Sequence, residues 1–212
     1  MADTESPLTE SPPIATADDG GDRRLATFRD ILRPMQPGRL LDLGTGHGKF
    51  ALIAHEMGWR VTAVDVRTER MPMTPGIEWL QADVRTYDTT GFDCIALLGL
   101  LYHLSYADVR DLLARCATTA TILDTHTALK VNEVHDGYQG RRFEEIADFS
   151  AERLAKTPTA SWGNRASWWP TRTALIRLLR DVGYRTILAL DPPTHVDRTF
   201  YLCLPADRTR VP

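Results

Sequence analysis

The chain has 212 residues, of which 43% are hydrophobic and 25% charged, a composition typical of a globular protein with one full core. A formal net charge of -3 argues against a nucleic-acid partner, because a negatively charged protein does not attract phosphates over a broad surface. No apolar run approaches the roughly 20 residues that a membrane helix needs, and the 3 cysteines lack zinc-binding spacing. We therefore expect a cytoplasmic protein without a membrane partner.

Helices and strands alternate along the first part of the chain. Residues 1–21 are rich in Ser, Pro, Thr, Asp and Ala and predict a disordered tail, followed by one domain over residues 22–212. Apolar spacing predicts a helix over 22–32, a strand over 39–43, a helix over 47–57, strands over 60–66, 77–81 and 92–98, a helix over 106–116 and a strand over 120–124. This alternation indicates a doubly wound, mostly parallel α/β sheet, which binds ligands outside the carboxyl ends of its strands.

The alternation stops after residue 124. Residues 125–170 show no strong period, apart from a predicted short helix over 143–154, and we interpret this stretch as an inserted lid over a second substrate. A helix is predicted over 171–182, with Thr171 as its N-cap and Gly183 as its stop. Strands over 185–190 and 199–204 predict a closing antiparallel hairpin.

A glycine-rich motif at residues 42–48 reads Asp-Leu-Gly-Thr-Gly-His-Gly. Gly44, Gly46 and Gly48 lie between the first predicted strand and the helix that follows it. Glycine lets the backbone turn sharply and approach a ligand, and the free N–H groups of the helix start face the same place. The third glycine comes one position earlier than in a dinucleotide fingerprint. The motif therefore favours a nucleoside cofactor without a pyrophosphate.

Two acidic residues follow the next two strands. Asp65, at the end of the second strand, can accept hydrogen bonds from two ribose hydroxyls. Asp83, after the third strand, can accept one from the exocyclic amine of adenine, while Val84 offers its backbone N–H to the ring. The apolar run that ends the fourth strand at Leu98 can form a wall beside them.

The motifs at 42–48, 61–65, 81–84 and 92–99, in this order, resemble those of the class I S-adenosylmethionine-dependent methyltransferases. The resemblance covers residues 39–124 and implies a seven-stranded, Rossmann-like sheet with S-adenosyl-L-methionine as the cofactor. One departure is Arg67, because the family has an apolar or acidic residue two places after the ribose-binding acid. The implied cofactor-binding residues are Asp42, Gly44, Thr45, Gly46, Gly48, Asp65, Val66, Asp83, Val84 and Leu98.

The later part of the chain is similar, more loosely, to sugar O-methyltransferases. The similarity rests on residues 124–126, 137–145 and 167–171, and it is greatest to enzymes that methylate the 1-hydroxyl of short mannosides. It implies that the acceptor is a hydroxyl of a carbohydrate or related small molecule, with aromatic side chains stacked on sugar rings. The same aromatic residues would also suit a packed lid or a dimer interface, so monomer and homodimer both stay open. The candidate acceptor-binding residues are Tyr102, Tyr138, Arg142 and Trp169, with Trp162 and Trp168 as further stacking candidates.

Transfer of a methyl group to a hydroxyl needs a general base. His126 and Asp124, which end the fifth strand, are the first candidates, followed by His103 after the fourth strand and Glu144 in the lid. Mg²⁺ would polarise a sugar hydroxyl, although no tight ligand motif is visible. Its candidate ligands are Asp124, His126, Glu133, His135, Glu144 and Glu145.

Three alternatives stay open. Arg141 and Arg142 suggest a tRNA or protein amine as the acceptor, although the run 98–102 lacks the Asp/Asn-Pro-Pro-Tyr/Phe motif frequent in amine methyltransferases of this fold. A non-catalytic module that only binds the cofactor fits the same motifs. An NAD-dependent oxidoreductase fits them less well, because of the glycine spacing.

Overall fold

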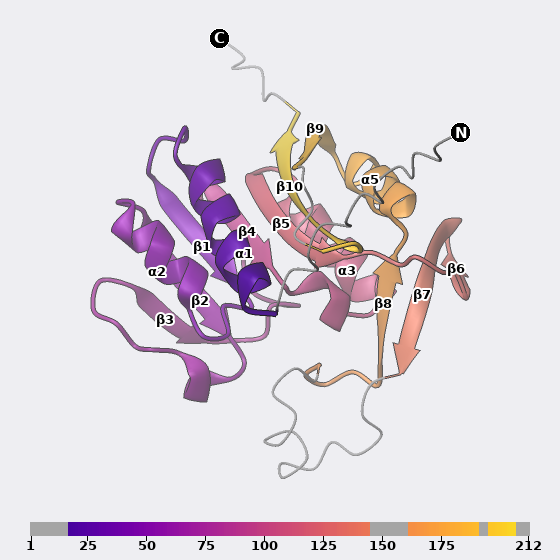
Figure 1. Cartoon of the computed structure of the whole chain (residues 1–212), viewed down its shortest axis with the longest axis horizontal. Coiled ribbons are helices and arrows are strands. Elements are labelled where there is room, and N and C mark those ends of the chain that lie inside the picture. Colours follow the sequence, from indigo (N-terminus) through magenta and orange to yellow (C-terminus); the bar gives the residue numbers. More distant parts are fainter. Residues whose placement is uncertain (1–16, 145–160, 191–194, 207–212) are drawn as a thin grey trace, which may run out of the picture.

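The computed structural model describes residues 17–144, 161–190 and 195–206. Its centre is a seven-stranded sheet in the order β3-β2-β1-β4-β5-β10-β9 (Figure 1). The first five strands pair in parallel, and β10 pairs antiparallel with both β5 and β9. The predicted doubly wound, mostly parallel sheet is therefore confirmed. The strands are β1 (Arg39–Leu43), β2 (Arg60–Asp65), β3 (Glu78–Gln81), β4 (Cys94–Leu98), β5 (Ala120–His126), β9 (Tyr184–Ala189) and β10 (Arg198–Pro205).

Helices cover both faces of this sheet. Leu40 and Leu41 are neighbours in β1 but belong to different apolar clusters, because successive side chains of a strand point to opposite faces. The cluster with Leu40 holds α1 and α2, and the cluster with Leu41 holds α3 and α5. The bounds are α1 (Ala17–Leu32), α2 (Lys49–Glu56), α3 (Tyr106–Cys116) and α5 (Arg172–Asp181). No helix in the described ranges is both long and apolar enough to span a membrane.

The helix boundaries follow local capping chemistry. The Thr171 hydroxyl accepts a hydrogen bond from the Ala174 N–H at 3.2 Å, which makes Thr171 the N-cap of α5 as predicted. Ser105 caps α3 in the same way by accepting from the Asp108 N–H. The helix α1 begins at Ala17, within the predicted tail, rather than at residue 22.

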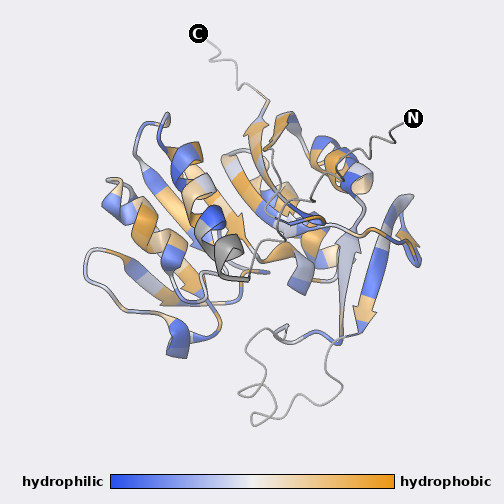
Figure 2. Cartoon of the chain, viewed as in Figure 1, coloured by the Kyte–Doolittle hydropathy of each residue, from blue (hydrophilic) through white to orange (hydrophobic). Residues whose placement is uncertain are grey.

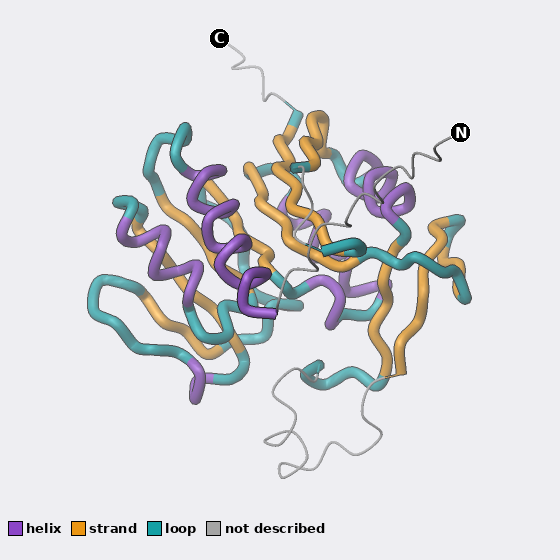
Figure 3. The backbone as a smooth tube through the Cα atoms, viewed as in Figure 1, coloured by secondary structure: helices purple, strands orange, loops and turns teal. Residues whose placement is uncertain are grey.

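A second, three-stranded antiparallel sheet occupies much of the predicted aperiodic stretch (Figure 3). Its strands are β6 (Glu133–His135), β7 (Tyr138–Glu144) and β8 (Ala166–Pro170). The predicted helix over 143–154 is wrong at its start, because Phe143 and Glu144 pair with Ser167 and Ala166 in extended structure. Its remaining residues lie outside the described ranges. The strand β7 is mostly hydrophilic (Figure 2), so it carries no apolar period.

Candidate active site

A cavity of about 240 Å³ lies at the carboxyl ends of the parallel strands, where this type of sheet binds ligands. Of the predicted cofactor-binding residues, Gly44, Gly46, Asp65, Val66, Asp83 and Val84 line it. Asp42, Thr45, Gly48 and Leu98 do not line it. The other lining residues are Arg67, Arg70, Arg85, Gly99, Leu100, His103, Leu104, Ser161 and Trp162.

The glycine loop forms one wall of the cavity. Gly44, Gly46 and Gly48 have φ angles of 73°, 54° and 67°, in the left-handed region that favours glycine. A Cβ at Gly46 would meet no atom within 4 Å, so a side chain there would project into open space that a ligand can use. At Gly48 a Cβ would lie 2.5 Å from the Trp79 ring, so this glycine is required by packing.

Two carboxylates face the cavity from the ends of β2 and β3. The Asp65 carboxylate accepts hydrogen bonds from the backbone N–H groups of Gly46 and Arg67, each at 2.9 Å, which fix its orientation. The Asp83 carboxylate accepts from Arg85, whose Nη2 lies 2.6 Å from Oδ2. These hydrogen bonds lower the pKa of Asp83, so it carries a full negative charge at neutral pH.

Asp42 contacts the glycine loop through the side chain of Thr45. Its side chain is 1% exposed, and Oδ2 accepts a hydrogen bond of 2.6 Å from the Thr45 hydroxyl. Burial raises the pKa of Asp42 to about 6, despite the opposing effect of that hydrogen bond. The charged form is therefore disfavoured by the fold.

This raised pKa makes a signed prediction for Asp42→Asn. A carboxyl group whose folded pKa exceeds its unfolded value contributes stability at low pH that is lost as pH rises through the folded value. The free energy of unfolding of the wild type, minus that of the variant, should therefore fall by up to about 3 kcal/mol between pH 4 and pH 7. Urea unfolding of both proteins without cofactor measures this difference. A difference that does not change with pH would contradict the buried acid.

Asp124 is completely buried and holds two arginines. Its carboxylate accepts from Arg24 Nε at 2.7 Å, and from Arg198 Nε and Nη2 at 2.8 Å each. Burial lowers the pKa of Arg198, but its hydrogen bonds and attraction to Asp124 outweigh this and raise it. The arrangement joins α1 and β10 to β5, and Asp124 is not among the residues that line the cavity.

His126 has both ring nitrogens engaged. Its Nδ1 lies 2.9 Å from Asp197 Oδ1, and its Nε2 lies 3.2 Å from Arg198 Nη1. Because arginine only donates, Nε2 must accept and the proton must reside on Nδ1. Burial and the charge of Arg198 lower the pKa of His126, so the ring is neutral at pH 7. A base needs that Nε2 lone pair, which Arg198 already occupies.

His103 occupies a different position. It ends the short 3-10 helix η2 (Leu101–His103) after β4, and it lines the cavity. Its Nδ1 lies 3.0 Å from the Ser161 hydroxyl, and that serine is 1% exposed. The imidazole is therefore oriented by a buried hydroxyl at the border between the cavity and the second sheet.

The predicted acceptor-binding residues fall into two separate groups. The Tyr102 ring lies 4.9 Å from the His126 ring and 5.7 Å from the Trp169 ring, and Trp169 Nε1 donates to the Tyr102 carbonyl. The ring of His103 lies 4.4 Å from that of Tyr102. We name Tyr102, His126 and Trp169 the aromatic cluster.

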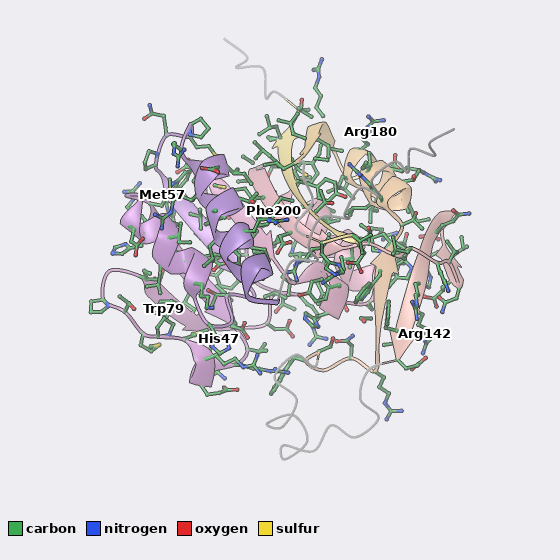
Figure 4. The ribbon with its side chains drawn as sticks, in the orientation of Figure 1. His47, Met57, Trp79, Arg142, Arg180 and Phe200 are labelled. Carbon is green, nitrogen blue, oxygen red and sulfur yellow. The ribbon has the colours of Figure 1, made fainter. Side chains whose placement is uncertain are left out.

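The second group lies on β7, away from the cavity. The Tyr138 hydroxyl donates to Asp181 on α5. Arg142 Nε donates to Glu144 at 2.7 Å, so each satisfies the charge of the other. Figure 4 shows Arg142 on β7, far from His47 of the glycine loop. The structure therefore does not bring Tyr138, Arg142 or Glu144 to the cavity.

The candidate Mg²⁺ ligands are likewise dispersed. Asp124 is engaged by arginines, and Glu133 pairs with His135 at 3.0 Å on β6. Glu145 lies outside the described residues. No group of three or more His, Cys, Asp or Glu side chains suited to a metal occurs within the described ranges. The donor set present there does not fit Mg²⁺.

The sequence does not predict several of the residues that line the cavity. Arg67 and Arg85 each stand two places after a strand-end acid, and that spacing is the signal that could have placed them beside Asp65 and Asp83. Ser161 and Trp162 precede β8 and carry no local signal, because only the pairing of distant segments brings them to the cavity.

The fold and cavity define a class I methyltransferase. A family model described as a methyltransferase domain matches residues 20–189, more than half of the chain. The chain therefore belongs to this methyltransferase family. Its sheet has the architecture of the class I S-adenosylmethionine-dependent methyltransferases. A search of curated proteins found no match.

Solved structures share this fold. The N-terminal domain of EvdMO1 with S-adenosylhomocysteine bound is 23% identical, with a TM-score of 0.68 over 91% of this chain and 82% of that one. A 1,6-didemethyltoxoflavin-N1-methyltransferase from Burkholderia thailandensis is 18% identical, with a TM-score of 0.59 over 93% and 94%. The glycopeptide N-methyltransferase MtfA, complexed with S-adenosylmethionine, is 15% identical, with a TM-score of 0.58 over 86% and 87%. These likenesses concern the fold.

Proposed function

We propose that this protein transfers the methyl group of S-adenosylmethionine to a hydroxyl of a carbohydrate or related small molecule. The observation that carries the proposal is His103, which lines the cofactor cavity and also lies beside the aromatic cluster. A proton acceptor at this border would serve an acceptor that stacks on the cluster. The N-terminal domain of EvdMO1, similar in fold, has been crystallised in the presence of S-adenosylhomocysteine and D-fucose. A mannoside 1-hydroxyl is one acceptor within this class.

The cavity residues fit the donor chemically. Asp65 keeps acceptor capacity for ribose hydroxyls, because each carboxylate oxygen offers two lone-pair sites and accepts one backbone N–H. Gly46 leaves open space where a side chain would block a ligand. S-adenosylmethionine, when bound, supplies an electrophilic methyl group on a sulfonium.

His103 is our candidate for the general base. If its Nδ1–H donates to Ser161, then Nε2 carries the lone pair that accepts the hydroxyl proton while the acceptor oxygen takes the methyl group. His126 instead orients Arg198, and Asp124 anchors Arg24 and Arg198. Tyr102 and Trp169 offer an aromatic surface that holds a sugar ring close to His103 and excludes water.

A labelled-methyl assay tests this function. Radiolabelled S-adenosylmethionine is incubated with neutral sugars and short oligosaccharides, total tRNA and peptide pools. We expect label in an alkali-stable methyl ether of a carbohydrate. Asp65→Asn is the inactive control, because loss of two charge-assisted hydrogen bonds to ribose should weaken S-adenosylhomocysteine binding about 100-fold. Glu69→Gln, an exposed neighbour, should bind normally.

Other outcomes decide between the alternatives. Label confined to tRNA or peptide amines would replace the carbohydrate proposal with an N-methyltransferase. Calorimetric binding of S-adenosylhomocysteine without transfer to any pool would support a non-catalytic binding module.

A further inference from the structure

One wall of the donor cavity comes from outside the methyltransferase motifs. Trp162 lies just before β8 of the second sheet, yet it lines the same cavity as Asp65 and Val84. Its side chain is 46% exposed, whereas the neighbouring Ser161 is 1% exposed. A half-exposed indole beside a cavity with valine and leucine side chains offers a flat apolar surface to a ligand.

Three loops of the core hold this short segment in place. Ser161 Oγ lies 3.0 Å from His103 Nδ1, on the loop after β4. The guanidinium of Arg67, after β2, lies 5.6 Å from the centre of the Trp162 ring. A Cβ at Gly163 would lie 3.2 Å from Nη2 of Arg85, after β3. The segment 161–163 therefore lies against the sheet edge that carries Asp65 and Asp83.

Arg67 explains how the indole is oriented. It is only 7% exposed, and its backbone N–H donates to Asp65, so its position is tied to that carboxylate. Burial and the charge of Arg70 lower the pKa of Arg67, as expected for a cation enclosed among cavity walls. The residue that departs from the family pattern therefore forms a link between Asp65 and Trp162.

We infer that Trp162 stacks on the adenine base of the methyl donor, and that the segment leading into β8 completes the donor site. The inference rests on the proposed function, which places S-adenosylmethionine in this cavity. It assigns the adenine base, rather than an acceptor sugar ring, as the partner of this tryptophan. Asp83 and Val84, the residues proposed to read the edge of adenine, line the same cavity.

Ligand fragments separate the adenine contact from the rest of the donor. S-adenosylhomocysteine, 5′-methylthioadenosine and S-ribosylhomocysteine are titrated into wild type, Trp162→Ala and Trp162→Phe by calorimetry. Loss of base stacking in Trp162→Ala should weaken the two adenine-containing ligands about tenfold or more. S-ribosylhomocysteine, which lacks adenine, should bind both proteins alike. Trp162→Phe keeps an aromatic face, so its loss should be less than about threefold.

Intrinsic fluorescence gives an independent measurement. The chain has 5 tryptophans, and adenine stacking should quench Trp162 in the wild type. The quench should disappear in Trp162→Phe and persist in Trp169→Phe, because Trp169 does not line the cavity. Circular dichroism melting of each variant without ligand checks that the fold is retained.

Each failure has a distinct signature. S-adenosylhomocysteine affinity within twofold of wild type in Trp162→Ala would overturn the stacking inference while leaving the proposed cofactor intact. A raised KM for the acceptor with unchanged donor affinity would likewise overturn it and assign Trp162 to the acceptor. Absence of binding of all three ligands to the wild type would overturn the proposed function itself.

Discussion

Replacing His103 with glutamine is expected to lower kcat by about 10²–10⁴-fold, because the acceptor hydroxyl would lose its general base. The dissociation constant of S-adenosylhomocysteine should stay within about twofold, since glutamine retains a polar side chain at the cavity border. Initial rates of labelled-methyl transfer, combined with calorimetry, measure the two quantities separately.

His126→Gln is the matched comparison for His103. Both are histidines within one ring contact of Tyr102, but His126 Nε2 already accepts from Arg198. We expect its kcat to fall by less than about tenfold, through disturbed orientation of Arg198 rather than loss of a base. A larger loss in His126→Gln than in His103→Gln would return the base role to the fifth strand.

Asp124→Asn is expected to lower the free energy of unfolding by about 3–5 kcal/mol, because two largely buried guanidinium groups lose their shared carboxylate. For a domain of this size, that loss corresponds to a fall in Tm of roughly 10 °C. Urea and thermal unfolding followed by circular dichroism measure the change. Asp111→Asn is the control, because Asp111 is exposed and pairs with the neighbouring, exposed Arg110, so it should change stability by less than about 0.5 kcal/mol.

A double-mutant comparison measures the interaction energy between Asp124 and Arg198. In an Arg198→Met background, Asp124→Asn should cost less, because one of the two buried cations is already absent. Unchanged stability of Asp124→Asn, together with a large loss of kcat, would instead show that Asp124 acts in the chemistry.

The sequence predicts the donor half of the site because its signals are local. Gly44 and Gly46 follow a buried strand directly, and Asp65 ends the next one, so strand order alone brings them to one edge. The β-strands of the core are apolar runs, and Thr171 is a clear N-cap. These elements depend on neighbours within a few residues, which a single sequence displays.

The acceptor half depends on contacts between distant segments. Asp124 lies 100 positions from Arg24 and 74 from Arg198, and no local sequence pattern predicts those ion pairs. The strand β7 carries arginines and glutamine rather than alternating apolar residues, so its pairing with β8 is hidden. Phe143 is therefore extended, because it pairs with Ser167 of β8, although the sequence predicts that a helix begins there. The same separation in sequence explains why the sequence suggests sugar stacking for Trp162, whereas the structure places it in the cavity lining.

The position of β10 bears on how the polypeptide assembles during synthesis. This strand lies between β5 and β9, and Arg198 at its start shares Asp124 with Arg24 of the first helix. The far edge of the sheet, and the ion pairs that join Asp124 to both arginines, can therefore form only after residues 198–205 have been synthesised. Because these contacts join segments that are far apart in the sequence, we expect them to form late in folding, after the local helices and the parallel strand pairs.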